Sequence, residues 1–438
     1  MDSLTQTDPY LKQVTTLGDT HQVVATEDIL NDEGISLVKQ GTAVNSSLYD
    51  RLVRHKLLRP LDYSLTSADV VSPPELITDV KRLLENEPEL SLAVETQFIQ
   101  RDLLTPLGHI RLEPPLAFKL TVCREQCPQR YQHLLRVSLM ALYLATQLRW
   151  TSGDKQELAT AALFHDLGEM HLEPSLFESS SQLTPAELRQ IYAHPTIAYL
   201  FLREFPAYSP RISNIVHQHH ERLDGSGYPK GLTGDEILPA ARLLGAAEML
   251  VVIRLEKPET GSKLYSTTEV LKLNAERFGC DLILPLVEAA KRIDDATPTM
   301  SSSTTTNQTV LQARLKLLVE ILQGAAAIDT EEGTDMAHFV SSQMRQVMEM
   351  ANRCGVVLNT STGPFDIIGD DEQALSELDA LVREMIFLVQ SAVREAQRRW
   401  IKEEIPNEEQ TPLAQWVRNT ELALYSAGFQ SEVVAETL

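Results

Sequence analysis

The sequence has few cysteines, no long uninterrupted apolar segment and a shortage of basic side chains. Four cysteines occur in 438 residues, too few for a disulfide framework, and this usage predicts a protein of the reducing cytoplasm. The most apolar segment, residues 237–255, contains Arg242 and Glu248. Because charges at the centre of a membrane helix are costly, we expect no membrane insertion.

The shortage of positive charge limits the partners that the chain can have. It contains 39 Lys and Arg residues against 61 Asp and Glu residues, which gives a net charge of −22. Such a field repels polymeric nucleic acid and anionic membrane surfaces, so neither is expected as a partner. A small anionic ligand is still compatible with this charge, because a metal ion can reverse the sign of the potential inside one pocket.

The first 66 residues are predicted to form a small α+β domain. The first twenty show no evident apolar period and are expected to be loose. Residues 21–25 and 35–44 have strand patterns, joined through a turn at 31–34 in which Gly34 can adopt a positive φ. Asn45 or Ser46 is a suitable cap for a helix over residues 46–57.

The rest of the chain is predicted to be mainly α-helical, and its length allows two or three domains in all. We divide it into a helical connector (67–117), a histidine-rich helical domain (118–296), a polar linker (297–310) and a helical C-terminal domain (311–438). Seven of the eleven histidines fall between His133 and His220. The C-terminal helices have apolar spacing typical of core or of a helix-partner face, and no chemistry is predicted there.

The strongest chemical signal is an adjacent histidine and aspartate at the end of an apolar helix, His165 and Asp166, with Gly168 as the expected helix C-cap. Neighbouring helical positions point about 100° apart, which suits two metal ions or one bridged pair. Such a dipeptide is common by chance. Further histidines on successive predicted helices, His133, His194 and the group around His219, argue against coincidence.

A cluster of this composition indicates a transition-metal centre. Imidazole ligands suit Fe, Mn, Zn, Co or Ni, and a carboxylate can bridge two ions. The absence of thiolates from the set argues against structural zinc, and Cys123 and Cys127 are interpreted as packing residues. Residues 224–237 form a glycine-rich loop, whose backbone N–H groups could approach a phosphate or a base.

These motifs resemble those of the HD-GYP domain family. The resemblance covers residues 118–293 and is carried by His133-x-x-Arg136, His165-Asp166-x-Gly168, His194-Pro195, His219-His220-Glu221 and Gly227-Tyr228-Pro229, in the order and spacing of that family. It implies an all-helical bundle of the HD phosphohydrolase kind around a two- or three-metal centre, so that residues 118–296 would be an HD-GYP metal phosphohydrolase domain. The usual activity of the family is hydrolysis of cyclic di-GMP to pGpG and GMP.

The resemblance also implies roles for single residues. It implies that Asp166 bridges two ions and that Asp166 and His165 are catalytic. The expected ligands of two divalent ions, Fe or Mn, are His133, His165, Asp166, His194, His219, His220 and Glu248, the last standing where the family has Asp. The residues expected to line the nucleotide cleft are Gly227, Tyr228, Pro229, Lys230 and Lys257.

Besides Glu248, the sequence departs from the family pattern at three further places, which leaves more than one function open. Glu169 replaces a lysine, Gln129 replaces a Glu of three-metal members, and residues 257–259 replace Arg-Pro-Tyr. The leading hypothesis is a metal-dependent cyclic di-GMP phosphodiesterase with two ions at most. The alternative is a weak or inactive receptor that binds cyclic di-GMP or a signalling protein such as a diguanylate cyclase domain. A phosphohydrolase acting on another nucleotide is a third reading.

Overall fold

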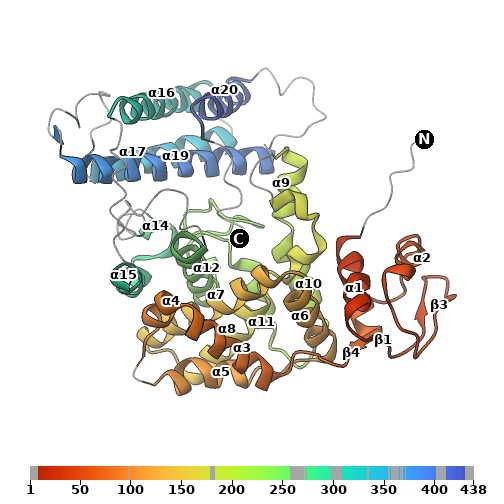
Figure 1. Ribbon diagram of the computed structural model, residues 1–438. Helices are drawn as coiled ribbons and strands as arrows, with labels where there is room; N and C mark the ends of the chain where they lie inside the picture. The colour runs from red at the N-terminus through yellow and green to blue at the C-terminus, as the bar shows by residue number, and fades with distance from the viewer. Residues whose placement is uncertain are drawn as a thin grey trace.

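The fold is mainly α-helical, as predicted, and a computed structural model describes most of the chain (Figure 1). The described residues are 8–96, 98–177, 183–256, 274–296, 308–332, 335–353, 371–400 and 411–429, with positions 271, 356, 365, 368 and 369. Within these ranges, β-structure consists of two small two-stranded sheets and three isolated bridges. None of the helices described there combines the length and the apolar character that crossing a bilayer would require.

The first helix corrects the prediction that the first twenty residues are loose. Helix α1 (Pro9–Thr20) begins after Asp8, whose side chain accepts a hydrogen bond from the backbone N–H of Leu11. Its buried residues include Tyr10, Val14 and Leu17, which follow a helical i, i+4, i+7 spacing. Three turns with few apolar residues gave too weak a pattern to be seen in the sequence, and burial against other elements stabilises the helix instead.

The two predicted strands are confirmed in part, because Val24 and Ala43 form an isolated antiparallel bridge, but most of the strand pairing involves other partners. Strand β1 (Val23–Ala25) pairs with β4 (Leu65–Ser67), while β2 (Ile29–Leu30) pairs with β3 (Ser36–Val38). The turn at 31–34 therefore joins β2 to β3, and Gly34 has the expected positive φ of 80°. Further along, the Asn45 side chain accepts a hydrogen bond from Ser47 N–H, and the predicted helix is a short 3-10 turn, η1 (Ser46–Leu48), followed by α2 (Tyr49–Val53).

Helices then follow one another through the histidine-rich segment, and many of them begin with proline at the first turn, where its missing N–H costs nothing. The residues before the histidine-rich segment form the 3-10 turn η2 (Leu61–Ser64), α3 (Pro73–Asn86), α4 (Pro88–Ala93), the π-helical turn η3 (Gln100–Leu104) and α5 (Thr105–Gly108). The histidine-rich bundle contains α6 (Pro114–Gln126), α7 (Pro128–Gln147), α8 (Ser152–Phe164), η4 (Leu167–His171), η5 (Pro174–Phe177), α9 (Pro185–Ile191), α10 (His194–Leu202), α11 (Pro210–Gln218), η6 (Gly234–Glu236), α12 (Pro239–Val251), η7 (Val252–Glu256), α14 (Ala275–Phe278) and α15 (Cys280–Ala296).

One hydrophobic core runs from α1 to α15. Helix α7 lies at its centre and packs against α8 and α12, while α11 packs against α8 and α10. Helix α15 returns to α4, so the end of the bundle closes on the segment that precedes it. The bundle therefore places the ends of α8 and α11, the start of α10 and the middle of α12 around one point.

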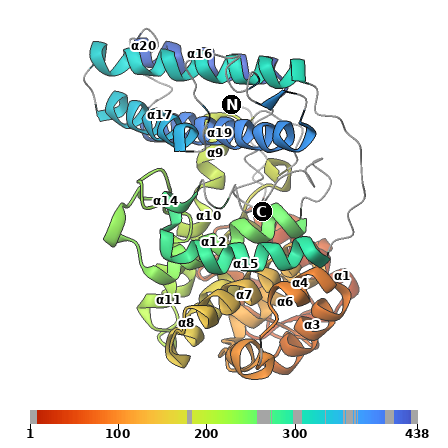
Figure 2. The same cartoon turned by 90° about the vertical axis from the view of Figure 1, so that its left-hand side faces the viewer.

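The last helices form a separate layer with its own core (Figures 1 and 2). They are α16 (Gln308–Glu332), α17 (Asp335–Arg353), α19 (Glu372–Trp400) and α20 (Pro412–Ser426). Helix α9 reaches up from the bundle and contacts α19. Residues 297–307 of the predicted linker lie outside the described residues, and α16 begins at Gln308. The division into domains remains a proposal.

Candidate metal centre

The bundle brings all seven predicted metal ligands together. His133 comes from α7, His165 follows the last turn of α8, and Asp166 is the next residue. His194 is the first residue of α10, His219 and His220 follow α11, and Glu248 lies on α12. All seven side chains are buried; none of these residues is more than 3% exposed.

Close backbone contacts at three glycines make this convergence possible. A Cβ atom on Gly168 would lie 2.1 Å from the carbonyl oxygen of His194, and one on Gly245 would lie 2.1 Å from that of His219. A Cβ atom on Gly227 would lie 2.3 Å from the carbonyl oxygen of His220. Gly168 was predicted as the C-cap of the helix that ends at His165 and Asp166. That prediction is wrong: His165 is the C-cap of α8, and Gly168 lies inside η4, where it allows the chain to approach α10.

Asp166 lies between two pairs of histidines. Its Oδ2 atom is 3.4 Å from His133 Nε2 and 3.1 Å from His165 Nε2. Its Oδ1 atom is 3.3 Å from His194 Nε2 and 3.5 Å from His219 Nε2. Each carboxylate oxygen therefore faces a different pair of imidazoles, which is the arrangement that a bridging ligand requires.

Three of the histidines are oriented by the same backbone contact. The Nδ1–H group of His165 donates to the carbonyl of Ala162 at 2.8 Å, and that of His194 donates to the carbonyl of Ile191 at 2.9 Å. His219 makes the equivalent bond to the residue three positions earlier. A proton held on Nδ1 leaves the Nε2 lone pair available, and such a bond fixes the ring orientation of a metal-binding histidine.

Glu248 and His220 complete two sets of four ligands. The first set is His133, His165, Asp166 and Glu248; the second is Asp166, His194, His219 and His220. In each set one ligand atom per residue lies within 4.8 Å of the others. The sets share Asp166, and His220 Nε2 is 3.2 Å from His194 Nε2 and 3.8 Å from Glu248 Oε1.

The buried carboxylate and imidazole side chains of these two sets are suited to bind cations. Both oxygens of Asp166 and of Glu248 are buried without a hydrogen-bond partner among the described residues, as is His219 Nε2. Burial, together with the negative charge of Asp166, raises the pKa of Glu248 well above its usual range. Burial also opposes ionisation of Asp166, but the surrounding histidines, His165 foremost, hold its pKa well below the usual range. Divalent cations would satisfy both carboxylates.

Two of the three histidines in the second set, His219 and His220, have a lowered pKa and are neutral at physiological pH. Burial lowers the pKa of His219 to about 4, although its contact with Asp166 opposes this change. Burial also lowers the pKa of His220 well below its usual range, and the neighbouring His219 and His194 act in the same direction. Because a metal binds the unprotonated imidazole, these two side chains need lose no proton to become ligands.

Glu169, the residue that departs from the family pattern, is neutralised by an arginine that the sequence analysis missed. Arg130 Nε donates to Glu169 Oε2 at 2.8 Å, and the pair is buried, with Arg130 14% exposed and Glu169 1% exposed. The Arg130 guanidinium also lies 5.1 Å from the centre of the Phe177 ring. Burial raises the pKa of Glu169 to about 7 against the opposing effect of Arg130. Arg130 lies three residues before His133, so it shares a face of α7 with this ligand, and that spacing was the available signal.

The glycine-rich loop lies against the second ligand set. The Tyr228 ring stacks on His220, with 4.5 Å between ring centres, and also contacts Tyr192 at 4.2 Å, a contact that the sequence did not indicate. Glu221 holds the loop closed, because its carboxylate accepts hydrogen bonds from the backbone N–H groups of Lys230 and Leu232 at 2.7 and 2.8 Å.

The remaining predicted cleft residues are Pro229, Lys230 and Lys257. The backbone of Pro229 accepts a hydrogen bond from Arg398 of α19 at 3.1 Å, which ties the loop to the C-terminal layer. Lys230 is exposed, and its positive charge helps to lower the pKa of His217, which is not one of the predicted ligands. Lys257 lies outside the described residues.

Comparisons with known proteins agree with this geometry. Residues 119–278 match the family model described as HD domain. The 3′3′-cGAMP-specific phosphodiesterase 3 of Vibrio cholerae is 27% identical over 213 residues, which are 47% of this chain and 46% of that protein. The cyclic di-GMP phosphodiesterase PA4108 of Pseudomonas aeruginosa is 28% identical over 149 residues, 34% of this chain and 36% of that protein.

A third relative matches over a shorter segment. The cyclic di-GMP phosphodiesterase response regulator RpfG of Xanthomonas campestris is 31% identical over 126 residues, which are 28% of this chain and 33% of that protein. The chain thus spans less than half the length of each of these relatives. Their similarity and the domain match show that residues 119–278 form an HD domain. The predicted resemblance is confirmed to the extent that the HD domain model matches residues 119–278, within the predicted segment 118–296.

Proposed function

We propose that the protein is a metal-dependent phosphodiesterase that hydrolyses cyclic di-GMP to pGpG and GMP. The observation that carries the proposal is the pair of four-ligand sets that share the buried carboxylate of Asp166. The names of the relatives support the substrate class, because they are phosphodiesterases of cyclic di-GMP or of 3′3′-cGAMP. The presence of the family's glycine-rich loop beside the second set supports a cyclic dinucleotide over a simple phosphate ester.

The seven ligands would hold two divalent ions, iron or manganese. When bound, such ions lower the pKa of water and neutralise charge on phosphoryl oxygens. Asp166 would contact both ions, and His165 would contact one through Nε2 while its Nδ1–H stays bonded to the Ala162 carbonyl. Gln129, in place of the third-metal Glu, supports two ions rather than three.

The loop and Arg130 would position the substrate. Gly227 and Pro229 set the path of the loop, and Tyr228, fixed between His220 and Tyr192, would present its ring edge and hydroxyl on the substrate side. Arg130 would supply the cation that the family's lysine provides, because it is buried beside Glu169 and its charge acts on Asp166. Lys230, which is exposed, would contribute positive charge nearer the surface of the cleft, and Lys257 stays a predicted cleft residue outside the described residues.

The test is turnover by protein purified without oxygen, with bound iron and manganese measured in the same sample. Cyclic di-GMP and 3′3′-cGAMP should be assayed in parallel. We expect pGpG or GMP from cyclic di-GMP, lost together with the metal in Asp166→Ala. His217→Gln is the matched control, because His217 contacts Thr196 and Tyr199 outside both ligand sets, and it should retain metal and turnover. Product from 3′3′-cGAMP alone would contradict the substrate assignment.

A second candidate function is a receptor with little or no turnover. It is favoured by Glu169, because this buried acid holds Arg130 at 2.8 Å and competes with a phosphate for it. Such a receptor would bind cyclic di-GMP, or a signalling protein such as a diguanylate cyclase domain. Tight binding of cyclic di-GMP to metal-loaded protein, with no product over hours, would select it over the hydrolase.

A further inference from the structure

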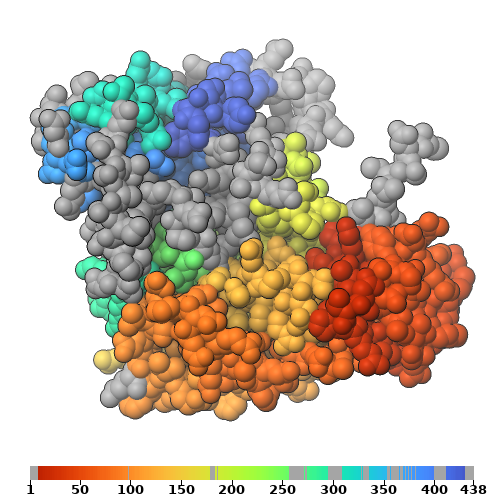
Figure 3. All heavy atoms as spheres, in the orientation of Figure 1, coloured from red at the N-terminus to blue at the C-terminus, as the bar shows by residue number. Residues whose placement is uncertain are grey.

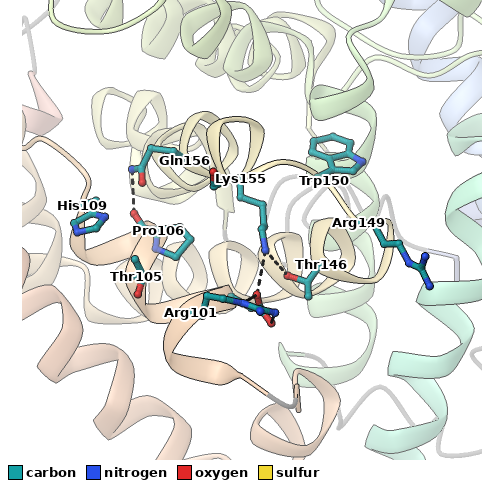
Figure 4. A pocket seen from close by; sticks show the side chains of 11 residues that line it. Arg101, Thr105, Pro106, His109, Thr146, Arg149, Trp150, Lys155 and Gln156 are labelled. Carbon is teal, nitrogen blue, oxygen red and sulfur yellow. Dashed lines mark hydrogen bonds and ion pairs between the residues drawn. The ribbon is translucent and has the colours of Figure 1, made fainter.

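A cavity of about 500 Å³ lies on the bundle away from the metal ligands (Figure 4). One wall is formed by η3 and α5, and the other by the end of α7 and the first turn of α8. Thr146, Arg149 and Trp150 come from the α7 end, and Lys155 comes from α8. The volume falls within the range of small-molecule binding sites, about 300–1,000 Å³.

The cavity is positively charged, although the chain carries a net charge of −22. Three cations line it: Arg101, Arg149 and Lys155. Asp102 is the one acid among its described lining residues, and both of its oxygens are engaged. Arg101 binds them in a fork at 2.8 and 3.1 Å, and Lys155 Nζ is 3.2 Å from Oδ1. The lining therefore has two positive charges in excess, which favours an anionic ligand.

The start of α8 adds to this potential. Ser152, Lys155 and Gln156 of its first turn line the cavity. The helix has 13 residues. Thr151 caps its start by accepting a hydrogen bond from Asp154 N–H, and the N–H groups that this cap leaves available favour phosphate. Together with the three cationic side chains, the start of α8 makes the α7–α8 junction a suitable site for phosphate groups.

An aromatic ring lies at the same junction. Trp150 is half-buried, and no ring or cation of the described residues stacks on its indole. Stacking of a nucleobase on an exposed aromatic face stabilises binding by about 1–3 kcal/mol. Arg149, the residue before it, has a φ of 57°, in the left-handed region where glycine is normal at a helix end. Glycine would suit this backbone better, so the fold itself does not require arginine here.

We propose that this cavity is a second ligand site, which binds a nucleotide. The phosphate of the nucleotide would contact Lys155, Arg149 and the start of α8, and the base of the nucleotide would stack on Trp150. The site lies at the opposite ends of α7 and α8 from His133 and His165, about 20 Å along a helix of 13 residues. The metal centre is therefore not part of it, and the proposal does not rest on the catalytic function.

Titration calorimetry on the full chain tests this site, with GMP and pyrophosphate as probes. We expect GMP to bind, and Arg149→Gly and Lys155→Gln each to weaken its binding at least tenfold. Trp150→Leu should weaken GMP binding while pyrophosphate binding changes less than twofold. Arg149→Gly should unfold at the same temperature as the parent or higher, because glycine suits a positive φ, so its loss of binding cannot be attributed to misfolding.

The metal centre can also bind nucleotides, so Asp166→Ala serves as the background that separates the two sites. The proposal expects GMP affinity to be unchanged within twofold in Asp166→Ala. Loss of binding in that variant would overturn the site, and so would equal GMP binding by Asp166→Ala with and without Arg149→Gly or Lys155→Gln. Pyrophosphate binding as tight as GMP binding would overturn the assignment of a nucleotide, and so would the absence of any GMP binding.

Discussion

Glu169 stands where the family pattern has lysine, and in the structure its carboxylate is paired with the guanidinium of Arg130. The sequence alone suggested that two units of charge had been lost beside the metal centre. Arg130 restores one cation at this place through a buried ion pair of 2.8 Å. The sequence could not show this, because the partner is 39 residues away and is defined only by the packing of α7 against η4.

A lysine at position 169 should therefore lower the free energy of unfolding unless Arg130 is changed as well. Glu169→Lys would bury two cations together, and we expect it to lower the free energy of unfolding by about 3–5 kcal/mol. Arg130→Gln combined with Glu169→Lys should recover most of that loss. Urea unfolding of the parent, both single variants and the double variant measures the coupling. Equal losses in Glu169→Lys and in the double variant would contradict the compensation.

Glu248 gives the metal affinity a pH dependence. Because its pKa is raised by burial and by Asp166, the metal-free protein holds a proton there that a metal must displace. Apparent affinity should therefore rise with pH, by up to about tenfold per unit while that proton is bound. Competition with a chelator at pH 6, 7 and 8 measures the slope. Glu248→Gln, which has no proton to release, should bind more weakly and with a flatter slope; an unchanged slope would rule out this role.

At the scale of elements, three glycines set how closely the ligand-bearing segments approach. Gly168, Gly227 and Gly245 each face the carbonyl of a predicted ligand, His194, His220 and His219. The sequence analysis singled out the first two for other reasons and passed over Gly245, because a glycine inside an apolar helix gives no sign of what packs against it. The close contacts explain why small residues are needed at all three positions.

Alanine at these glycines should displace ligands without unfolding the bundle. Gly245→Ala and Gly168→Ala each place a methyl group 2.1 Å from a carbonyl oxygen, and we expect a cost of about 1–3 kcal/mol and a clear loss of bound metal. Gly153→Ala is the control, because its nearest neighbour is Thr151 Oγ1 at 3.8 Å. Metal analysis and thermal unfolding of the three variants test this. Full metal content in Gly245→Ala would contradict the argument.

The elements also show which sequence signals were sufficient. The seven candidate ligands were chosen because the family motifs fix their spacing, and the structure brings them close together. The long helices were predicted because their apolar period is strong. Helix α1 was missed because tertiary burial, rather than its own pattern, stabilises it. The partner of β1 was missed because β4 lies 40 residues further along the chain, and local patterns carry no information about such pairing.

At the scale of the molecule, a buried ionic cluster joins the N-terminal elements to the metal-binding bundle. Lys119 of α6 is 1% exposed, and its Nζ atom is 3.1 Å from Asp62 Oδ2 and 3.5 Å from the centre of the Tyr10 ring. The Tyr10 hydroxyl donates to the other oxygen of Asp62. Helix α1 also contacts η4, the turn that follows Asp166. Figure 3 shows the N-terminal residues in direct contact with the bundle.

The cluster should behave as a unit in a double-mutant cycle. Lys119→Met leaves the Asp62 carboxylate buried without its cation, and we expect a loss of about 3–5 kcal/mol in the free energy of unfolding. Asp62→Asn together with Lys119→Met removes both charges and keeps an oxygen for the Tyr10 hydroxyl, so it should be closer to the parent. Chemical denaturation of the four proteins gives the coupling energy. Additive losses would show that the ion pair does not hold these elements together.

Lys119 also restricts how this chain could be recombined with others. A join after residue 66 would separate Tyr10 and Asp62 from Lys119. Any replacement would leave a lysine in the bundle's wall with no acid to neutralise it, unless the incoming segment brought a carboxylate and an aromatic ring to the same spot. A successful exchange should therefore either carry such a pair or be accompanied by loss of the lysine, which makes position 119 a marker of the ancestry of the N-terminal segment.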